Sequence, residues 1–117
     1  MKFLPQVLLI TSFGDGGFRF GSHSHLGDLL VLPKGMWAWE ADDYSLIVAE
    51  KLSIDFVLIG TGSTMVRPSR AALKKMADAG LNMDFMSTSS AVHTYNVMVA
   101  EGRRLAAAFK AVQKAVP

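Results

Sequence analysis

The sequence predicts an α/β fold in which parallel strands alternate with helices. The first observation is an unbroken apolar run at residues 56–59, Phe-Val-Leu-Ile, without polar alternation, which is typical of a strand covered on both faces. The second is that helix-forming segments follow at residues 69–80 and 87–101. The third is the short β-favouring segment between them, at residues 81–86. This order predicts right-handed crossovers between parallel neighbours, with residues 56–59 as the central strand.

Capping residues mark the limits of the predicted helices. Ser69 is an N-cap candidate, and Gly80 stands where a helix end favours a left-handed residue. The hydroxyl cluster at residues 87–90, Ser-Thr-Ser-Ser, is suited to cap the following helix. An earlier helix is predicted after Asp42 or Asp43, either of which can cap it. Its apolar positions are Leu46, Ile47, Val48 and Leu52.

The first twenty residues predict two short strands. Residues 7–10, Val-Leu-Leu-Ile, can form one of them. The glycine-rich turn at residues 14–17 then leads into Phe18-Arg19-Phe20. Because side chains alternate along a strand, Phe18 and Phe20 are expected to share one face, with Arg19 on the other.

A hairpin is predicted immediately downstream. Residues 29–32, Leu-Leu-Val-Leu, indicate a buried strand, which Pro33 ends. The chain turns at the following glycine and resumes as a strand that carries Trp37 and Trp39 on one face. Residues 29–39 are therefore expected to form a hairpin with an aromatic wall.

Composition narrows the classes of partner. The chain of 117 residues is expected to form one domain, residues 1–117. Hydrophobic residues make up 50% and charged residues 19%, so a protein partner or a second copy of the chain could cover apolar surface beyond the needs of a small core. The net charge of +2 comes from scattered basic residues, which argues against a nucleic-acid partner. No cysteine is present, which excludes disulfides and thiolate metal sites.

No apolar run approaches the roughly 20 residues that a membrane-spanning helix needs. We therefore expect no membrane span and a cytoplasmic location. Residues 3–10 are apolar like the middle of a signal peptide, but Pro5 and Gln6 interrupt them and no small-residue cleavage site follows. We expect a mature N-terminus.

A candidate ligand site lies at the end of the predicted central strand. Glycines there allow backbone angles closed to other residues, so amide groups can point outward, at the edge where open α/β sheets bind ligands. A phosphate or carboxylate would contact Gly60, Thr61, Gly62, Ser63 and Thr64. The alternative is a tight turn from strand to helix. The segment lacks the lysine and spacing of a P-loop and the third glycine of a dinucleotide fingerprint.

Three further polar residues could complete such an anion site. Ser87 and Thr88 follow the neighbouring predicted strand, so their hydroxyl groups could face the same crevice, although helix capping explains them equally well. Arg67 could donate two hydrogen bonds to the anion or simply be solvated. No cofactor is expected.

The histidines and the remaining serines do not form a recognisable metal or catalytic set. His23 and His25 project to the same side of an extended chain, but no acidic residue lies at a matched spacing, and His93 is distant in sequence. Ser12 and Ser22 lack the context of a nucleophile elbow. We therefore expect no metal site and no catalytic residue, and a non-enzymatic protein rather than an enzyme.

The C-terminal third contains an ambiguous segment. The alanines of residues 103–116 favour a continued helix, whereas Gly102 and the compact run at residues 105–109 suit a narrow buried strand. Chemistry alone favours the helix. Tyr95 and Asn96, in the helix predicted at residues 87–101, are expected to attach that helix to the sheet.

Five segments, in the same order along the chain, carry a resemblance to a known family. They are GDGGFRFG at residues 14–21, SHLGDLLVLPKGMWAW at 24–39, DFVLIGTG at 55–62, Pro68, and STSSAVHTYNVMVAEGRRLAAAF at 87–109. On these segments the chain resembles the domain-of-unknown-function family 498, the Mth938-like domain, to which mitochondrial complex I assembly factor 3 belongs. The similarity is greatest to bacterial members.

This resemblance implies a three-layer α/β fold with a mixed central sheet, parallel strand-helix-strand units and additional β-structure from the N-terminal half. It also implies that the last strand runs antiparallel to its neighbours. We therefore expect a strand near residues 104–109, followed by a short helical tail. Asp28 departs from the family pattern, since relatives often carry serine there.

The resemblance also implies a function, a protein-interaction or assembly module related to respiratory complex I assembly factors. A partner protein or a second copy would bind an aromatic face of the N-terminal β-structure. Its expected anchors are Phe18, Phe20, Trp37 and Trp39, which are core residues if that face is covered. The alternative function is a small-anion binder or minor enzyme that uses the crevice at residues 60–64 and 87–88.

Overall fold

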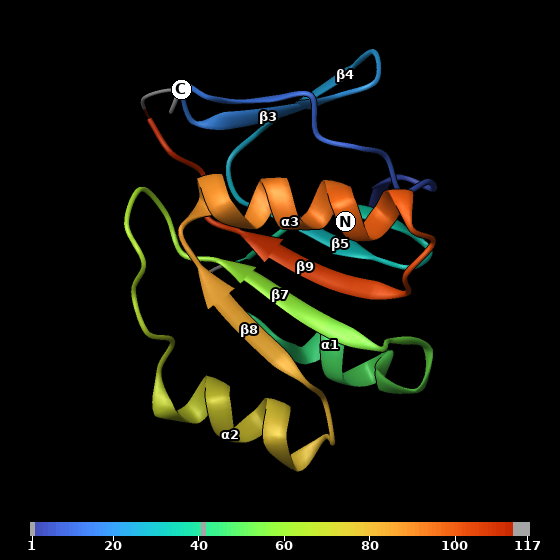
Figure 1. Cartoon of the computed structure of the whole chain (residues 1–117), viewed down its shortest axis with the longest axis vertical. Coiled ribbons are helices and arrows are strands. Elements are labelled where there is room, and N and C mark those ends of the chain that lie inside the picture. Colours follow the sequence, from blue (N-terminus) through green and yellow to red (C-terminus); the bar gives the residue numbers. More distant parts are fainter. Residues whose placement is uncertain (1, 41, 114–117) are drawn as a thin grey trace.

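The strands form two sheets, one large and mixed and one small and antiparallel (Figure 1). The computed structural model describes residues 2–40 and 42–113, and within them the large sheet has six strands in the order β1-β6-β5-β9-β7-β8. Their bounds are Lys2–Leu4 for β1, Gly35–Ala38 for β6, Leu29–Leu32 for β5, Leu105–Phe109 for β9, Phe56–Gly60 for β7 and Met83–Met86 for β8. The small sheet consists of β2 (Ser12–Gly14), β3 (Gly17–Phe20) and β4 (His23–Leu26).

The strand order corrects two expectations. β7 pairs in parallel with β8 and with β9, and α3 (Thr88–Ala100) carries the chain from β8 back across β7 to β9. The strand predicted to be central therefore lies beside the edge strand β8, and β5 and β9 occupy the middle. The last strand, β9, is antiparallel to β5 but parallel to β7, so the expectation that it opposes both neighbours is wrong on the β7 side.

Helices cover both faces of the large sheet, which produces the expected three-layer α/β arrangement (Figure 1). α1 (Ser45–Ala49) and α2 (Arg70–Asp78) pack on one face, whereas α3 and the small sheet pack on the other. Consecutive residues of β7 alternate between these layers. Leu58 contributes to the core beneath α3, and Ile59 contributes to the core beneath α2.

The predicted hairpin is confirmed. β5 and β6 are antiparallel neighbours, with Leu30 opposite Trp37, and all four residues of β5 are buried. β3 also forms as predicted, with Phe18 and Phe20 buried and Arg19 exposed between them. The alternation of side chains along a strand therefore identified the buried and exposed faces of β3 correctly.

Two of the three predicted helix caps form as expected. The Ser69 hydroxyl accepts the N–H of Ala72 at 3.1 Å, and Ser87 caps α3 by accepting the N–H of Ser90 at 3.4 Å. The side chain of the residue at the N-cap of α1, Tyr44, forms no capping hydrogen bond. The Asp43 carboxylate accepts the N–H of Ser45 at 2.9 Å, and hydrogen bonding from Ser45 lowers its pKa.

The helix predicted after Asp43 is shorter than its apolar spacing suggested. α1 ends at Ala49 and a 3₁₀ turn, Lys51–Ser53, follows. The tighter turn breaks the 3.6-residue period, and Leu52 on it is 90% exposed. Within α1, Ile47 is buried and Leu46 is 46% exposed. The apolar spacing therefore predicted the helix but not that it ends before Leu52.

Residues 7–10 do not form the predicted strand. Their backbone groups are instead bound by side chains of α3. The Tyr95 hydroxyl donates to the carbonyl of Leu8 at 2.7 Å, and the Asn96 amide bonds to both backbone groups of Ile10. Helix side chains thus replace the neighbouring strand that an extended segment otherwise requires.

The segment at residues 105–109 is the buried strand β9, not a helix. Ala106 and Ala108 face the layer of α1 and α2, and Ala107 faces α3. These small side chains allow both layers to approach the strand closely, and burial outweighs alanine's preference for helix. Residues 110–113 are not helical, and the rest of the predicted helical tail lies outside the described residues.

Candidate functional site

The glycine turn after β7 is held by hydrogen bonds to the start of α3. The N–H of Thr61 donates to the carbonyl of Met86 at 2.8 Å, and the N–H of Gly62 donates to the Thr88 hydroxyl at 3.0 Å. In return, the N–H of Thr88 donates to the carbonyl of Gly62 at 2.8 Å. The Thr61 and Gly62 amides, which were candidates for holding an anion, are thus already paired within the protein.

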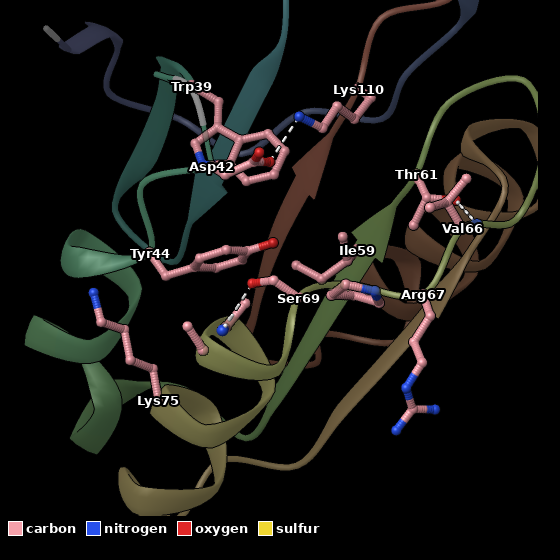
Figure 2. Close-up of a pocket in the computed structure, with 13 residues that line it drawn as sticks. Trp39, Asp42, Tyr44, Ile59, Thr61, Val66, Arg67, Ser69, Lys75 and Lys110 are labelled. Atoms are coloured by element: carbon pink, nitrogen blue, oxygen red, sulfur yellow. Dashed lines mark hydrogen bonds and ion pairs between the residues drawn. The ribbon is translucent and has the colours of Figure 1, made fainter.

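The Thr61 hydroxyl is also hydrogen-bonded within the protein. Its oxygen lies 2.8 Å from the carbonyl oxygen of Thr64 and 3.1 Å from that of Met86, and it accepts the N–H of Val66 at 2.9 Å (Figure 2). This arrangement braces the first half of the connection from β7 to α2. It supports a structural role for these residues, although the connection spans residues 61–69 and is longer than the tight strand-to-helix turn that was expected.

Thr88 closes the turn from the other side. Its side chain is fully buried, and its hydroxyl donates to the carbonyl of Lys110 at 2.7 Å while accepting from Gly62. A Cβ added at Gly60 would lie 3.0 Å from Phe109 and 3.1 Å from the Thr88 hydroxyl. Gly60 therefore allows close packing, whereas Gly62 has space around it and provides a φ of +107°.

The remaining predicted anion ligands lie apart from this buried junction. Ser63 and Thr64 are exposed on the loop, and the Ser87 hydroxyl donates to that of Ser90 at 3.3 Å. The Arg67 guanidinium lies 6.0 Å from the centroid of the Phe85 ring. The structure thus brings Thr61, Gly62 and Thr88 together, as strand order predicts, without leaving an open crevice between them.

An open pocket of about 260 Å³ lies on the other side of Thr61, over the layer of α1 and α2 (Figure 2). One wall comes from Trp39 and Tyr44, and the start of α2 forms the facing wall. Its lining residues are Trp39, Asp42, Tyr44, Ile59, Thr61, Val66, Arg67, Pro68, Ser69, Ala71, Ala72, Lys75 and Lys110. Thr61 and Arg67 are the predicted site residues that it includes.

Cationic side chains outnumber acidic ones in this pocket. Arg67, Lys75 and Lys110 line it, with Asp42 as the acidic residue. Lys110 Nζ lies 2.7 Å from Asp42 Oδ1 and 5.2 Å from the centroid of the Trp39 ring, so it is held by an ion pair and a cation–π contact. The charged ends of Arg67 and Lys75 lie at the edge of the pocket (Figure 2), so the lining residues carry a net positive charge that favours an anion at its mouth.

Tyr44 contributes a hydroxyl group to the pocket from a largely buried ring. Its side chain is 6% exposed, and its ring contacts Trp39 edge-on at 5.6 Å between centroids. Its hydroxyl forms no hydrogen bond with residues 2–40 or 42–113 and points toward the space between Asp42 and Ser69 in Figure 2. Burial, and secondarily the charge of Asp42, raises the pKa of Tyr44 to about 12.

Sequence reasoning missed Tyr44, Lys75 and Lys110 as site residues. The first two fall in predicted helical regions, where nothing local distinguishes them from surface residues. A signal existed for Lys110, because it follows β9 as Thr61 follows β7, and parallel strands bring such residues to one edge of a sheet.

The four predicted interaction anchors are buried on two different sides of the sheet. Phe18 and Phe20 belong to the core beneath α3, whereas Trp37 and Trp39 belong to the core beneath α1 and α2. The expected aromatic face is therefore covered, and these residues serve as core. His25 Nε2 lies 2.8 Å from the carbonyl oxygen of Asp28.

Within the described part of the chain, no helix has the length and apolar character needed to cross a bilayer. The same residues contain no group of three or more histidine and acidic side chains placed to hold a metal ion.

Sequence comparisons connect the chain to bacterial and mitochondrial proteins. It is 32% identical over 112 residues to an uncharacterised protein of Rhodobacter capsulatus, covering 95% of this chain and 90% of that protein. It is 29% identical over 111 residues to NADH dehydrogenase [ubiquinone] 1 alpha subcomplex assembly factor 3 of Xenopus tropicalis. That alignment covers 88% of this chain but only 61% of the relative, so the assembly factor is the longer protein.

Solved structures share the fold. A crystal structure described as an outer membrane protein from Bartonella henselae matches 95% of this chain and 100% of its own, with a TM-score of 0.90 and 33% identity. A Bordetella pertussis protein described as a Mth938-like domain matches 99% of this chain and 96% of its own, with a TM-score of 0.70 and 19% identity. At that identity the second likeness concerns the fold alone. A family model described as "Protein of unknown function (DUF498/DUF598)" matches residues 10–110, and the chain belongs to this family.

Proposed function

We propose that the protein is a non-enzymatic interaction module that takes part in the assembly of a respiratory NADH dehydrogenase. The observation that carries this proposal is the extent of the similarity to the assembly factors. It covers 88% of this chain, and the family match at residues 10–110 runs from the segment before β2 to the end of β9. The shared part is thus the folded unit itself.

The loop between β7 and α2 is the contact surface that we assign to this role. Met65 is 62% exposed and Val66 is 56% exposed, and adjacent exposed apolar side chains are candidates for burial in an interface. The hydrogen bonds of Thr61 and the cap at Ser69 hold both ends of the loop. A loop held in this way loses little conformational entropy when a partner binds.

The proposal is tested by crosslinking the tagged protein in cells that contain the respiratory enzyme, followed by mass spectrometry. We expect NADH dehydrogenase subunits or assembly intermediates to be enriched, and the Met65→Asp substitution to abolish the enrichment. Leu52→Asp is the matched control, because Leu52 is also an exposed apolar residue but precedes β7, at the opposite end of that strand.

Enrichment of no respiratory subunit would overturn the assembly role. Equal losses with Met65→Asp and Leu52→Asp would overturn the assignment of the loop. Light scattering on the purified protein identifies self-association, since a dimer that Met65→Asp dissociates would make a second copy of the chain the occupant of this surface.

A further inference from the structure

We propose that the pocket between Tyr44, Lys110 and the start of α2 binds a small organic anion, with a carboxylate or phosphate group attached to an apolar body. This pocket shares Thr61 with the glycine turn and Val66 with the proposed contact surface, but Met65 does not line it, so Met65→Asp tests the assembly role without removing a residue of the pocket. The inference rests on the pocket residues described below and not on the assembly role.

The first support is the distribution of donors around the pocket. Lys75 and Lys110 line the pocket from different elements, α2 and the end of β9, with the Lys75 ammonium at its edge on the side of α1 (Figure 2). The Ser69 hydroxyl satisfies the N–H of Ala72, while the N–H of Ala71, which also lines the pocket, has no acceptor among residues 2–40 and 42–113. Free N–H groups at the start of a nine-residue helix favour negative charge.

The second and independent support is the Tyr44 hydroxyl. The Tyr44 residue is 6% exposed, and its hydroxyl, which has no hydrogen-bond partner within the described chain, opens onto the pocket (Figure 2). Because burial raises its pKa to about 12, the group stays protonated at neutral pH and can donate a hydrogen bond to an anionic oxygen.

Asp42 faces the same space and repels an anion. Its carboxylate is paired with Lys110 at 2.7 Å and is exposed on its outer side, which reduces this repulsion. Asp43 lies nearby, and hydrogen bonding from Ser45 and, to a smaller extent, the charge of Lys75 lower its pKa. Arg67, Lys75 and Lys110 against Asp42 leave a positive balance on the lining residues.

The walls and the volume of the pocket indicate what the non-anionic part of the ligand is. Ile59, Pro68 and Ala72 supply apolar contacts, and the Trp39 ring lies on the opposite side. The volume of about 260 Å³ is below the roughly 300 Å³ at which pockets for drug-sized ligands begin. An anion with one aromatic or short aliphatic group fits this space better than a nucleotide does.

The test uses four probes in titrations followed by amide NMR signals of the full chain: inorganic phosphate, phenyl phosphate, benzoate and benzylamine. We expect saturable shifts at Tyr44, Ala71 and Lys75 with phenyl phosphate or benzoate at millimolar concentrations, and none with benzylamine. Comparing the Kd of phenyl phosphate with that of benzoate identifies which anionic group the pocket prefers. A response to inorganic phosphate equal to that of phenyl phosphate would overturn the apolar part of the proposal.

Two variants and one control locate the site. Tyr44→Phe keeps the ring packed against Trp39 and removes the donor, so the Kd should rise about tenfold, and Lys75→Gln should weaken binding by a similar factor. Lys74→Gln is the control, because Lys74 is on the same helix but pairs with Asp78 at 3.0 Å, outside the pocket.

Absence of saturable shifts with all three anions would overturn the proposal, as would equal shifts with benzylamine. Equal weakening by Lys74→Gln and Lys75→Gln would show a diffuse charge effect and overturn the assigned site. Amide spectra of each variant without a probe establish that it is folded.

Discussion

The Asn96 side chain forms two hydrogen bonds with the backbone of Ile10, a residue 86 positions earlier in the chain. Its amide oxygen accepts the Ile10 N–H at 2.8 Å, and its amide nitrogen donates to the Ile10 carbonyl at 2.8 Å. One side chain thus satisfies both backbone groups of a residue that has no strand neighbour. This pair, with Tyr95 and Leu8, attaches the segment before β2 to α3.

Asn96→Ala should therefore destabilise the fold by about 1–3 kcal/mol, because it leaves two partly buried backbone groups of Ile10 without partners. The free energy of unfolding in urea measures this effect. His93→Ala, an exposed change on the same helix, should alter it by no more than about 0.5 kcal/mol. Equal effects of the two substitutions would contradict the role assigned to Asn96.

Thr88→Val should cost about 1–3 kcal/mol, since valine preserves the shape of threonine but removes the hydroxyl that bonds to Lys110 and Gly62. Urea unfolding again provides the measurement. Thr64→Val serves as the control, because Thr64 is exposed on the loop. If the two valine variants unfold at the same urea concentration, the turn does not depend on the buried hydroxyl.

Gly60→Ala should also destabilise the protein, by about 1–3 kcal/mol, because the added methyl group would crowd three packed neighbours. Its Cβ would lie 3.0 Å from Phe109, 3.1 Å from Thr88 and 3.2 Å from Ala91. Gly62→Ala meets no atom within 4 Å but is strained by the φ of +107°. Thermal unfolding should show both losses, and a wild-type melting temperature for Gly60→Ala would contradict the packing described here.

Stability should fall as the pH rises from about 10 to about 12. The pKa of Tyr44 is raised from 10.0 to about 12, chiefly by burial, so the folded state holds its proton at a pH where the unfolded state has lost it. The contribution is complete below pH 10 and is lost as the pH approaches 12. Solvent that reaches the hydroxyl through the pocket screens part of this effect, so the contribution is smaller than the roughly 1.36 kcal/mol per pKa unit expected without screening.

Tyr44→Phe should remove this contribution and flatten the dependence over that range. Burial also raises the pKa of Tyr95, and the chain has two tyrosines, so the variant leaves Tyr95 as the remaining phenol. Unfolding free energies, combined with the absorbance of tyrosinate, distinguish the two. An unchanged slope in Tyr44→Phe would show that its hydroxyl is not shielded from solvent.

Local features of the fold could be predicted because local chemistry determines them. The caps at Ser69 and Ser87 and the hairpin of β5 and β6 follow from neighbouring residues. The place of β9 does not, because strand order depends on which edge the chain reaches after crossing the sheet. The alanines of β9 favour helix in isolation, and only the layers on both sides make them a strand.

The candidate site could likewise be predicted only where neighbouring strands determine it. The junction of Thr61 with Thr88 was predictable, since both follow neighbouring parallel strands. The pocket was not, because its walls come from Trp39, Tyr44 and Lys110 on one side and the start of α2 on the other. These residues meet only when the hairpin, α2 and β9 are assembled. Tyr44 was also missed because it occupies the N-cap position of α1, for which Asp42 or Asp43 was predicted.

The position of β9 has a consequence for how the protein is made. A ribosome synthesises β5 and β7 well before Leu105–Phe109, yet these two strands become neighbours of β9 rather than of each other. Until the last strand emerges, the nascent chain therefore exposes two unpaired apolar strand edges. Chaperones should engage the chain in this interval, and translation that stops before Leu105 should leave a product prone to aggregate.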